Sequence, residues 1–195
     1  MTSILLVFAT VGEAKSTLHA VSAKAIQPNL YKYDQGRILI TGMGPLAACQ
    51  AISAHASPDE EVWNLGMSGA LNLQFPAETI VDIGQVTTLP IHAFQLDEHA
   101  EAMYKQLHPT ITLNHQDVRL VTTPFPVRGP TQERLGQDHD LVDMEGYAIA
   151  WAAQRLGIPC RLTKIVSDLA EDANPAAVQN QVARCSKLLA EHIAS

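Results

Sequence analysis

The chain has 195 residues and a mass of 21.1 kDa, with 47% apolar and 17% charged residues. This composition is typical of a globular protein and excludes a predominantly disordered one. The length predicts a single domain over residues 1–195. The 13 Lys and Arg residues against 20 Asp and Glu give a formal charge of −7, without a basic cluster. Because nucleic-acid binders need clustered cations, a polynucleotide partner is disfavoured and a small molecule is expected.

The N-terminal apolar run, residues 4–9, is too short for a signal peptide or a membrane span. The three cysteines, Cys49, Cys160 and Cys185, are isolated and show no metal-ligand spacing. They are typical of reduced thiols. We therefore expect a cytoplasmic protein that does not associate with membranes. The eight histidines form no spaced set either, so we expect neither a metal nor a cofactor.

Short apolar runs alternate with helical patterns in the first third of the chain. The run Ile4–Ala9 predicts a strand, and the spaced apolar residues that follow predict a helix over 13–25. Arg37–Thr41 predicts a second strand, which leads through a glycine loop into an Ala-rich helix ending at His55. A third strand is predicted over 62–65, ending at Gly66.

The same alternation continues to the end of the chain. Strands are predicted over 80–89, 119–123, 141–143 and 161–166, and helices over 97–107, 144–156 and the C-terminal segment. The helical stripe of that last segment comprises Val178, Val182, Cys185, Leu189 and Ile193. The pattern predicts an α/β fold, a three-layer αβα sandwich around a mixed, mainly parallel sheet. In such sheets the ligand binds at the carboxyl ends of the strands.

One strand end carries a glycine motif. Residues 42–47, Gly-Met-Gly-Pro-Leu-Ala, fit the G-x-G-x-x-A form of the dinucleotide-binding fingerprint. The ribose-binding acid should follow about 20 residues later, at the end of the next strand, but Asp59, Glu60 and Glu61 precede that strand. A turn that packs strand against helix is therefore favoured over a dinucleotide site. Binding of a nucleoside or an anion to the loop amides stays open.

Three carboxylates lie near predicted strand ends. Glu13 follows the first strand where a helix begins, and taken alone it is explained by the helix dipole. Glu145 lies in a nearly apolar segment, where a carboxylate is costly to bury unless it is paired or functional. For Asp168, which follows the last strand, a functional role and a turn-capping role are equally favoured.

Two of these carboxylates lie in motifs that carry a family resemblance. The segment 142–150, Val-Asp-Met-Glu-Gly-Tyr-Ala-Ile-Ala, is followed by 165–170, Ile-Val-Ser-Asp-Leu-Ala. This pair resembles the signature of the purine nucleoside phosphorylase and nucleosidase superfamily, and most of all its methylthioadenosine/S-adenosylhomocysteine nucleosidase branch. The loops 42–44 and 66–69 match the glycine loops of that family, and Glu13 matches its N-terminal glutamate. The resemblance runs from the first strand to the last helix.

The resemblance implies hydrolysis of the N-glycosidic bond of a purine-type nucleoside. Asp168 is then the general acid that protonates the base at N7, Glu145 holds the ribose hydroxyls, and Glu13 positions and deprotonates the attacking water. Met144 packs on the sugar, Phe125 stacks on the base, and Val127 supplies backbone contacts. The other implied substrate-binding residues are Gly44, Ser68, Gly69, Ser167 and Ala170.

Departures from the family pattern leave alternatives open. Phosphorylases hold phosphate with arginines, but residues 42–69 contain no Lys or Arg, so water is favoured over phosphate as the nucleophile. Met67 and Ser68 replace the usual Ser-Ala pair, and residues 85–119 form a shorter segment than in typical members. Futalosine, a nucleoside of menaquinone biosynthesis, is therefore an alternative substrate to methylthioadenosine. A non-catalytic nucleoside-binding module is disfavoured because binding needs no water-activating base. A homodimer is implied by the resemblance.

Overall fold

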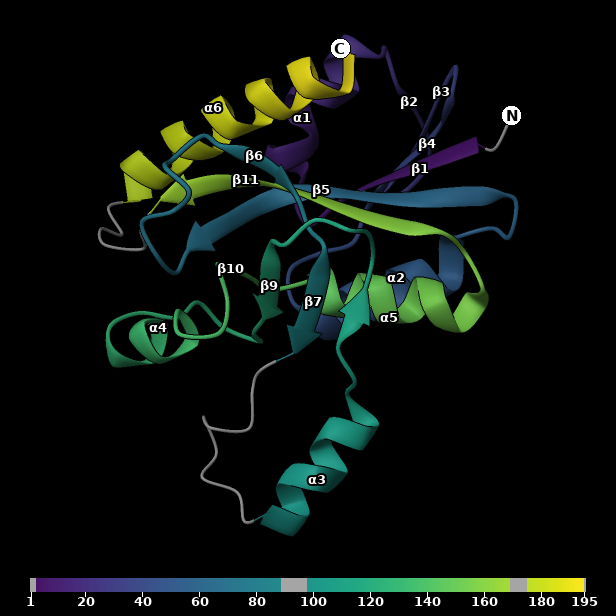
Figure 1. Ribbon diagram of the computed structural model, residues 1–195. Coiled ribbons are helices and arrows are strands. Elements are labelled where there is room, and N and C mark those ends of the chain that lie inside the picture. The colour runs from purple at the N-terminus through teal and green to yellow at the C-terminus, as the bar shows by residue number, and fades with distance from the viewer. Residues whose placement is uncertain (1–2, 89–97, 169–174, 195) are drawn as a thin grey trace.

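The computed structural model describes residues 3–88, 98–168 and 175–194 (Figure 1). Its helices and strands alternate along the chain, as the sequence predicts. They are β1 (Ser3–Phe8), α1 (Val11–Ala20), β2 (Lys24–Gln27), β3 (Leu30–Tyr33), β4 (Gly36–Ile40), α2 (Pro45–His55), β5 (Glu60–Ala70), β6 (Ile80–Asp82), β7 (Gln85–Thr88), α3 (Glu98–Leu107), β8 (Ile111–Thr112), β9 (Arg119–Thr122), α4 (Pro130–Leu135), β10 (Leu141–Asp143), α5 (Gly146–Leu156), β11 (Cys160–Asp168) and α6 (Pro175–Ala194).

The described strands form one mixed sheet of 11 strands. Its main path runs β2-β3-β4-β1-β5-β10-β9-β7-β8, and β11 joins it by pairing with β5 and with β6. The pairs β1–β4, β1–β5, β5–β11, β9–β10 and β7–β9 are parallel. The predicted mixed, mainly parallel sheet is confirmed. Its antiparallel pairs are β2–β3, β3–β4, β7–β8 and β6–β11, together with β5–β10 in the middle of the strand order.

Helices cover both faces of the sheet (Figure 1). On one face, Ala14 of α1 and Cys185 and Leu189 of α6 pack with Phe8 and Leu65. On the other face, apolar residues of α2 and α5 pack against the sheet in a larger cluster. The predicted three-layer sandwich is therefore confirmed. Among the described helices, none combines the length and apolarity that a membrane crossing requires.

The helix predicted over 13–25 is wrong in its second half. Helix α1 ends at Ala20, and Ser22 turns the chain with a φ of 50°. Residues 24–27 then form β2, which pairs with β3 in a hairpin at the sheet edge. All four side chains of β2 are exposed, so this strand carries no apolar alternation that sequence analysis could detect.

Strand β5 extends further than predicted. It does not end at Gly66 but runs to Ala70, so the second glycine loop, residues 66–69, is strand. The extension is held by two neighbours: β11 pairs with it as far as Gly69, and β10 pairs with Gly69 and Ala70. The predicted strand 80–89 is instead two strands, β6 and β7, on either side of Gly84. This arrangement brings the ends of β5, β10 and β11 together.

Candidate active site

A cavity of about 360 Å³ lies where the carboxyl ends of β1, β10 and β11 meet the end of β5. Seven of the predicted site residues line it: Glu13, Ser68, Gly69, Val127, Met144, Glu145 and Ser167. They come from five separate regions of the chain, which only the fold brings together. The position agrees with the rule that ligands bind at the carboxyl ends of the strands.

Glu13 is buried in this cavity wall, 7% exposed, and each of its carboxylate oxygens is held. Its Oε2 accepts hydrogen bonds from the backbone N and the Oγ1 of Thr10, at 2.9 and 3.0 Å. These contacts complete a capping box at the start of α1. Its Oε1 accepts a hydrogen bond from the Met67 N on β5, at 3.1 Å. Glu13 thus caps α1, and its own carboxylate is held against β5 by the Met67 amide.

Glu145 is the N-cap residue of α5, and its side chain reaches the first glycine loop. The Gly44 N donates a 2.7 Å hydrogen bond to Glu145 Oε1. Gly44 has a φ of 91°, a conformation that favours glycine. The glycine-loop amide therefore binds a carboxylate of the chain itself. This hydrogen bond accounts for the G-x-G-x-x-A motif of residues 42–47, so no dinucleotide ligand is needed to explain it.

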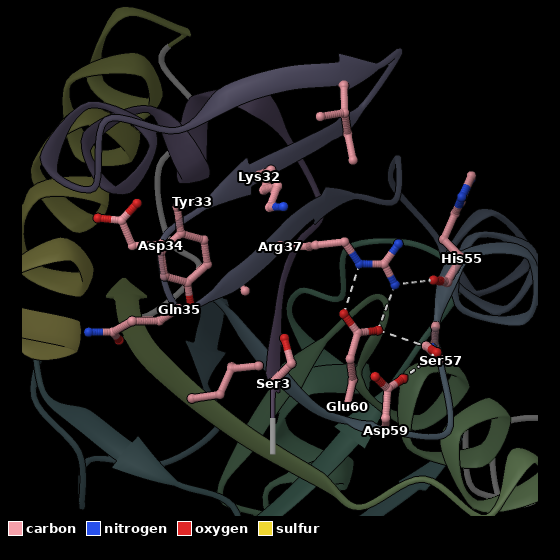
Figure 2. Close-up of a pocket in the computed structure, with 14 residues that line it drawn as sticks. Ser3, Lys32, Tyr33, Asp34, Gln35, Arg37, His55, Ser57, Asp59 and Glu60 are labelled. Carbon is pink, nitrogen blue, oxygen red and sulfur yellow. Dashed lines mark hydrogen bonds and ion pairs between the residues drawn. The ribbon is translucent and has the colours of Figure 1, made fainter. Parts of the chain in front are cut away.

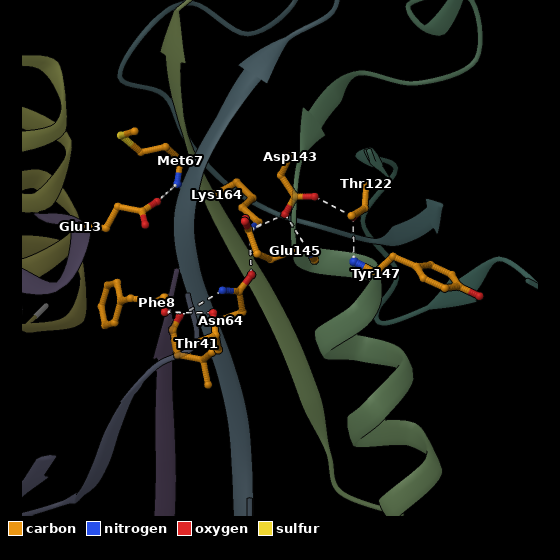
Figure 3. A network of polar contacts seen from close by, with 12 residues as sticks. Phe8, Glu13, Thr41, Asn64, Met67, Thr122, Asp143, Glu145, Tyr147 and Lys164 are labelled. Atoms are coloured by element: carbon orange, nitrogen blue, oxygen red, sulfur yellow. Dashed lines mark hydrogen bonds and ion pairs between the residues drawn. The ribbon is translucent and has the colours of Figure 1, made fainter. Parts of the chain in front are cut away.

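Beneath the cavity, a buried chain of polar contacts crosses the sheet (Figure 3). The Lys164 Nζ lies 2.7 Å from Asp143 Oδ2 and donates to Asn64 Oδ1, also at 2.7 Å. The side chains of Lys164 and Asp143 are 2% and 0% exposed. On one side, Asn64 donates to the Val7 carbonyl of β1 at 3.0 Å. The Lys164–Asp143 ion pair thus links β10 to β11, and Asn64 extends this link to β5 and β1.

Asp143 also fixes the start of α5. Its Oδ2 accepts from the Gly146 N at 2.8 Å, and its Oδ1 accepts from Thr122 Oγ1 at 2.6 Å. Thr122 Oγ1 in turn accepts from the Tyr147 N at 2.8 Å. Because Glu145 lies between these anchored residues, its backbone is held on both sides.

Glu13 and Lys164 face a common space above Gly66. A Cβ placed on Gly66 would lie 3.4 Å from Glu13 Oε1 and 3.4 Å from Lys164 Nζ. The absence of a side chain at Gly66 therefore leaves a small gap between a carboxylate and an ammonium. A water molecule in such a gap would have an acceptor on one side and a donor on the other.

Burial raises the pKa of Glu145 from 4.5 to about 7, and the nearby Asp143 carboxylate adds to the effect. The Gly44 hydrogen bond and the Lys164 charge act in the opposite direction. The general-acid role implied for Asp168 would require a raised pKa of that carboxyl, whereas among the described residues the carboxyl with a raised pKa is that of Glu145. The Glu145 carboxyl therefore titrates near neutral pH.

This raised pKa makes stability depend on pH. Below pH 4.5 Glu145 is protonated in both states, and between pH 4.5 and 7 only the unfolded state loses its proton. The free energy of unfolding therefore falls as pH rises through this window. We expect Glu145→Gln to match the wild type near pH 4 and to exceed it by on the order of 3 kcal/mol at pH 8. Urea unfolding at several pH values measures this difference, and a constant difference would contradict the assignment.

Four predicted site residues are not among those that line the cavity: Gly44, which contacts Glu145 instead, and Phe125, Asp168 and Ala170. Phe125 is 51% exposed and does not line it, whereas Pro126 and Val127 do. The Thr123 Oγ1 donates to the Phe125 carbonyl at 2.7 Å, and this turn directs the loop so that Val127 is buried. The prediction that Phe125 stacks on a bound base is therefore not supported by this geometry.

The other two predictions lie partly or wholly outside the described residues. Asp168 ends β11 opposite Gly69, so its backbone reaches the cavity edge, but its side chain lies outside the described part. Ala170 lies outside the described residues altogether.

Sequence analysis missed three charged residues of the site: Lys164, Asp143 and Arg128. Arg128 lines the cavity and follows the buried Val127. The cavity therefore has a cation in its wall, although residues 42–69 contain none. One of these residues, Lys164, could have been found from the sequence. It is a lone lysine in an apolar predicted strand, and an unpaired ammonium is costly to bury, so its position there indicates a paired or functional group.

A larger cavity, of about 1140 Å³, lies at the opposite ends of β1, β4 and β5 (Figure 2). Its most buried charged group is Glu60, which accepts two hydrogen bonds from Arg37, at 2.8 and 2.6 Å. Arg37 also donates to the His55 carbonyl at 2.6 Å. Because these groups satisfy one another, the arrangement is a structural ion pair that joins strand ends. The carboxyl-end cavity is the candidate active site.

A family model for the phosphorylase superfamily matches residues 29–195. The chain belongs to the phosphorylase superfamily. The match covers both glycine loops and the two signature segments, so the resemblance predicted from the sequence is confirmed. No functionally curated protein matches the sequence.

Solved structures of this superfamily are similar over nearly the whole chain. An MTAN from Chlamydia trachomatis bound to adenine is 25% identical with a TM-score of 0.79, covering 99% of this chain and 96% of that one. The same nucleosidase bound to MTA is 24% identical with a TM-score of 0.78 and the same coverage. An Asp-to-Asn variant of Helicobacter pylori MTAN with 5′-methylthioadenosine in the active site is 16% identical with a TM-score of 0.74, covering 99% of this chain and 96% of that one.

Within residues 85–119 the structure describes β7, α3 and β8.

Proposed function

We propose that the protein hydrolyses the N-glycosidic bond of a purine nucleoside such as 5′-methylthioadenosine or S-adenosylhomocysteine and releases the free base. The single observation that carries the proposal is the placement of Glu13, Glu145 and the end of β11 around one cavity. The nucleosidases with adenine or MTA bound have the same fold, which supports a purine ligand.

The chemistry requires a better leaving group and a nucleophile, because the transition state resembles an oxocarbenium ion. Asp168, at the end of β11, would protonate the base at N7. Glu145, held by Gly44, would bind the ribose hydroxyls beside Met144. Glu13 would deprotonate a water molecule in the gap above Gly66, opposite the Lys164 ammonium.

Charge favours water over phosphate as the nucleophile. In the described part of the chain, the walls and floor of the cavity hold the carboxylates of Glu13, Asp143 and Glu145. Lys164 is paired with Asp143, so its charge is already compensated. Arg128, the one cation among the described residues that line the cavity, is a weak match for a phosphate dianion beside these carboxylates, since phosphate binding relies on charge-assisted hydrogen bonds from cations. We therefore infer hydrolysis and retain phosphorolysis as the outcome that the experiment must exclude.

The remaining parts of the proposal concern cellular context. We place the reaction in the cytoplasm because the cysteines show no disulfide pattern, and we expect a homodimer from the family resemblance. Leu46, 86% exposed in the first turn of α2, and Met43, 70% exposed in the first glycine loop at the cavity rim, supply apolar surface for such a contact.

The experiment incubates the purified protein with 5′-methylthioadenosine, S-adenosylhomocysteine and futalosine, each with and without phosphate, and separates the products by chromatography. We expect free base and free sugar without phosphate. Release that requires phosphate and yields a sugar phosphate would instead establish a phosphorylase. Selective cleavage of futalosine would assign the alternative substrate. The Asp168→Asn variant, expected to bind adenine without turnover, controls for contaminating activity.

A further inference from the structure

Ser68 carries a buried hydroxyl that nothing satisfies in the described part of the protein. The residue is 3% exposed, and its Oγ has no hydrogen-bond partner among the described residues. Its backbone carbonyl is satisfied, because it accepts from Ser167 Oγ at 3.1 Å. A buried hydroxyl without a partner is unfavourable and uncommon, so its presence needs an explanation.

The hydroxyl lies on the cavity side of β5. Side chains alternate along a strand, so Asn64, Gly66 and Ser68 share one face of β5. Asn64 contacts Lys164 on that face, and the Gly66 position points at Glu13 and Lys164. Ser68 itself lines the cavity.

The surroundings of Ser68 match a purine ring better than a sugar. Ser68 pairs with Val166 just before the end of β11, the end that carries Asp168. The neighbouring cavity wall includes Val127 and Val142, which belong to one small apolar cluster. A flat apolar base with polar atoms at its edge fits such a wall. The ribose-binding Glu145 is anchored instead on the Gly44 loop.

We propose that the Ser68 hydroxyl binds an acceptor nitrogen of the purine ring and that its unmet hydrogen bond in the free protein is satisfied by substrate. The inference rests on the proposed function. It assigns a hydrogen bond to the base to Ser68, which the family resemblance implies only as a substrate-binding residue. It has an unusual thermodynamic consequence. Removing the hydroxyl should stabilise the free protein and weaken its ligand complex, whereas a merely structural serine would lower stability when removed.

The test compares wild type, Ser68→Ala and a matched control. Thr17 of α1 also has a buried Oγ1 without a partner among the described residues, but it does not line the cavity. In Thr17→Val the shape is kept and the hydroxyl is lost. We expect both variants to gain about 2–4 °C in the Tm of the free protein. Calorimetry with adenine as the ligand should show about tenfold weaker binding for Ser68→Ala and unchanged binding for Thr17→Val.

Analogues of adenine identify the contact. The analogues are 1-, 3- and 7-deazaadenine, each of which lacks one ring nitrogen. The analogue that lacks the contacted nitrogen should bind the wild type more weakly than adenine does. Its affinity should not fall further in Ser68→Ala. Unchanged adenine affinity in Ser68→Ala, or a lower Tm of that variant, would overturn the inference while leaving nucleoside hydrolysis intact. If the wild-type protein does not bind adenine, the inference and the proposed function fail together.

Discussion

Replacing Glu13 with Gln is expected to reduce the turnover of 5′-methylthioadenosine by about 10²- to 10⁴-fold, the range attributed to general acid–base catalysis. The amide cannot take a proton from water. Glutamine is, however, accepted in a capping box, so α1 should remain capped. Because Met67 and Thr10 donate to different oxygens of Glu13, the variant loses one of these contacts, at a cost of about 1 kcal/mol. Steady-state kinetics and urea unfolding of the same preparation measure both effects.

Glu133 provides the matched control for this substitution. It is an exposed acid in the first turn of α4 and does not line the cavity. Glu133→Gln removes the same charge from a comparable helix position, so turnover should be unchanged. A loss of turnover in Glu13→Gln smaller than tenfold would remove Glu13 from the role of base and leave it as a helix cap.

The layer architecture could be predicted because each central element has its own local signal. Apolar runs such as residues 4–9 and 38–40 predict buried strands, and Gly157, which ends α5 with a φ of 70°, is recognisable as a helix terminator. The β2–β3 hairpin could not be predicted, because β2 is exposed at every position. The extension of β5 through Gly69 depends on pairing with β10, a contact between residues far apart in the sequence.

The candidate site also contains some residues that could be predicted from the sequence and others that could not. Glu145 could be singled out because a carboxylate stands in an apolar segment, and it is indeed buried and held by Gly44. The roles of Lys164 and Asp143 could not be predicted, because a buried ion pair depends on two strands meeting in space. The orphan hydroxyl of Ser68 is likewise visible only once the cavity is known. Local chemistry thus predicts the candidate groups, and only tertiary pairing shows which of them interact.

The Lys164–Asp143 pair is expected to be the most sensitive point of the fold. Lys164→Met leaves the Asp143 carboxylate, 0% exposed, without its cation. Breaking a buried pair by removing one partner costs about 3–5 kcal/mol, so the free energy of unfolding should fall by that amount. Removing the ammonium also removes the charge that lowers the pKa of Glu145, so Glu145 should titrate at higher pH in this variant. Urea unfolding across pH measures both changes.

A second substitution separates the lost charge from the lost side chain. In the double variant Lys164→Met, Asp143→Asn, no charge is left buried, so most of the lost stability should return. The surface pair Lys187–Glu191 on α6 is the control, because its side chains are 74% and 60% exposed. Lys187→Met should change stability by less than about 0.5 kcal/mol. If the double variant is as unstable as Lys164→Met alone, the loss comes from packing of the lysine stem. In that case the ion pair is not what holds β10, β11 and the start of α5 in place beneath the cavity.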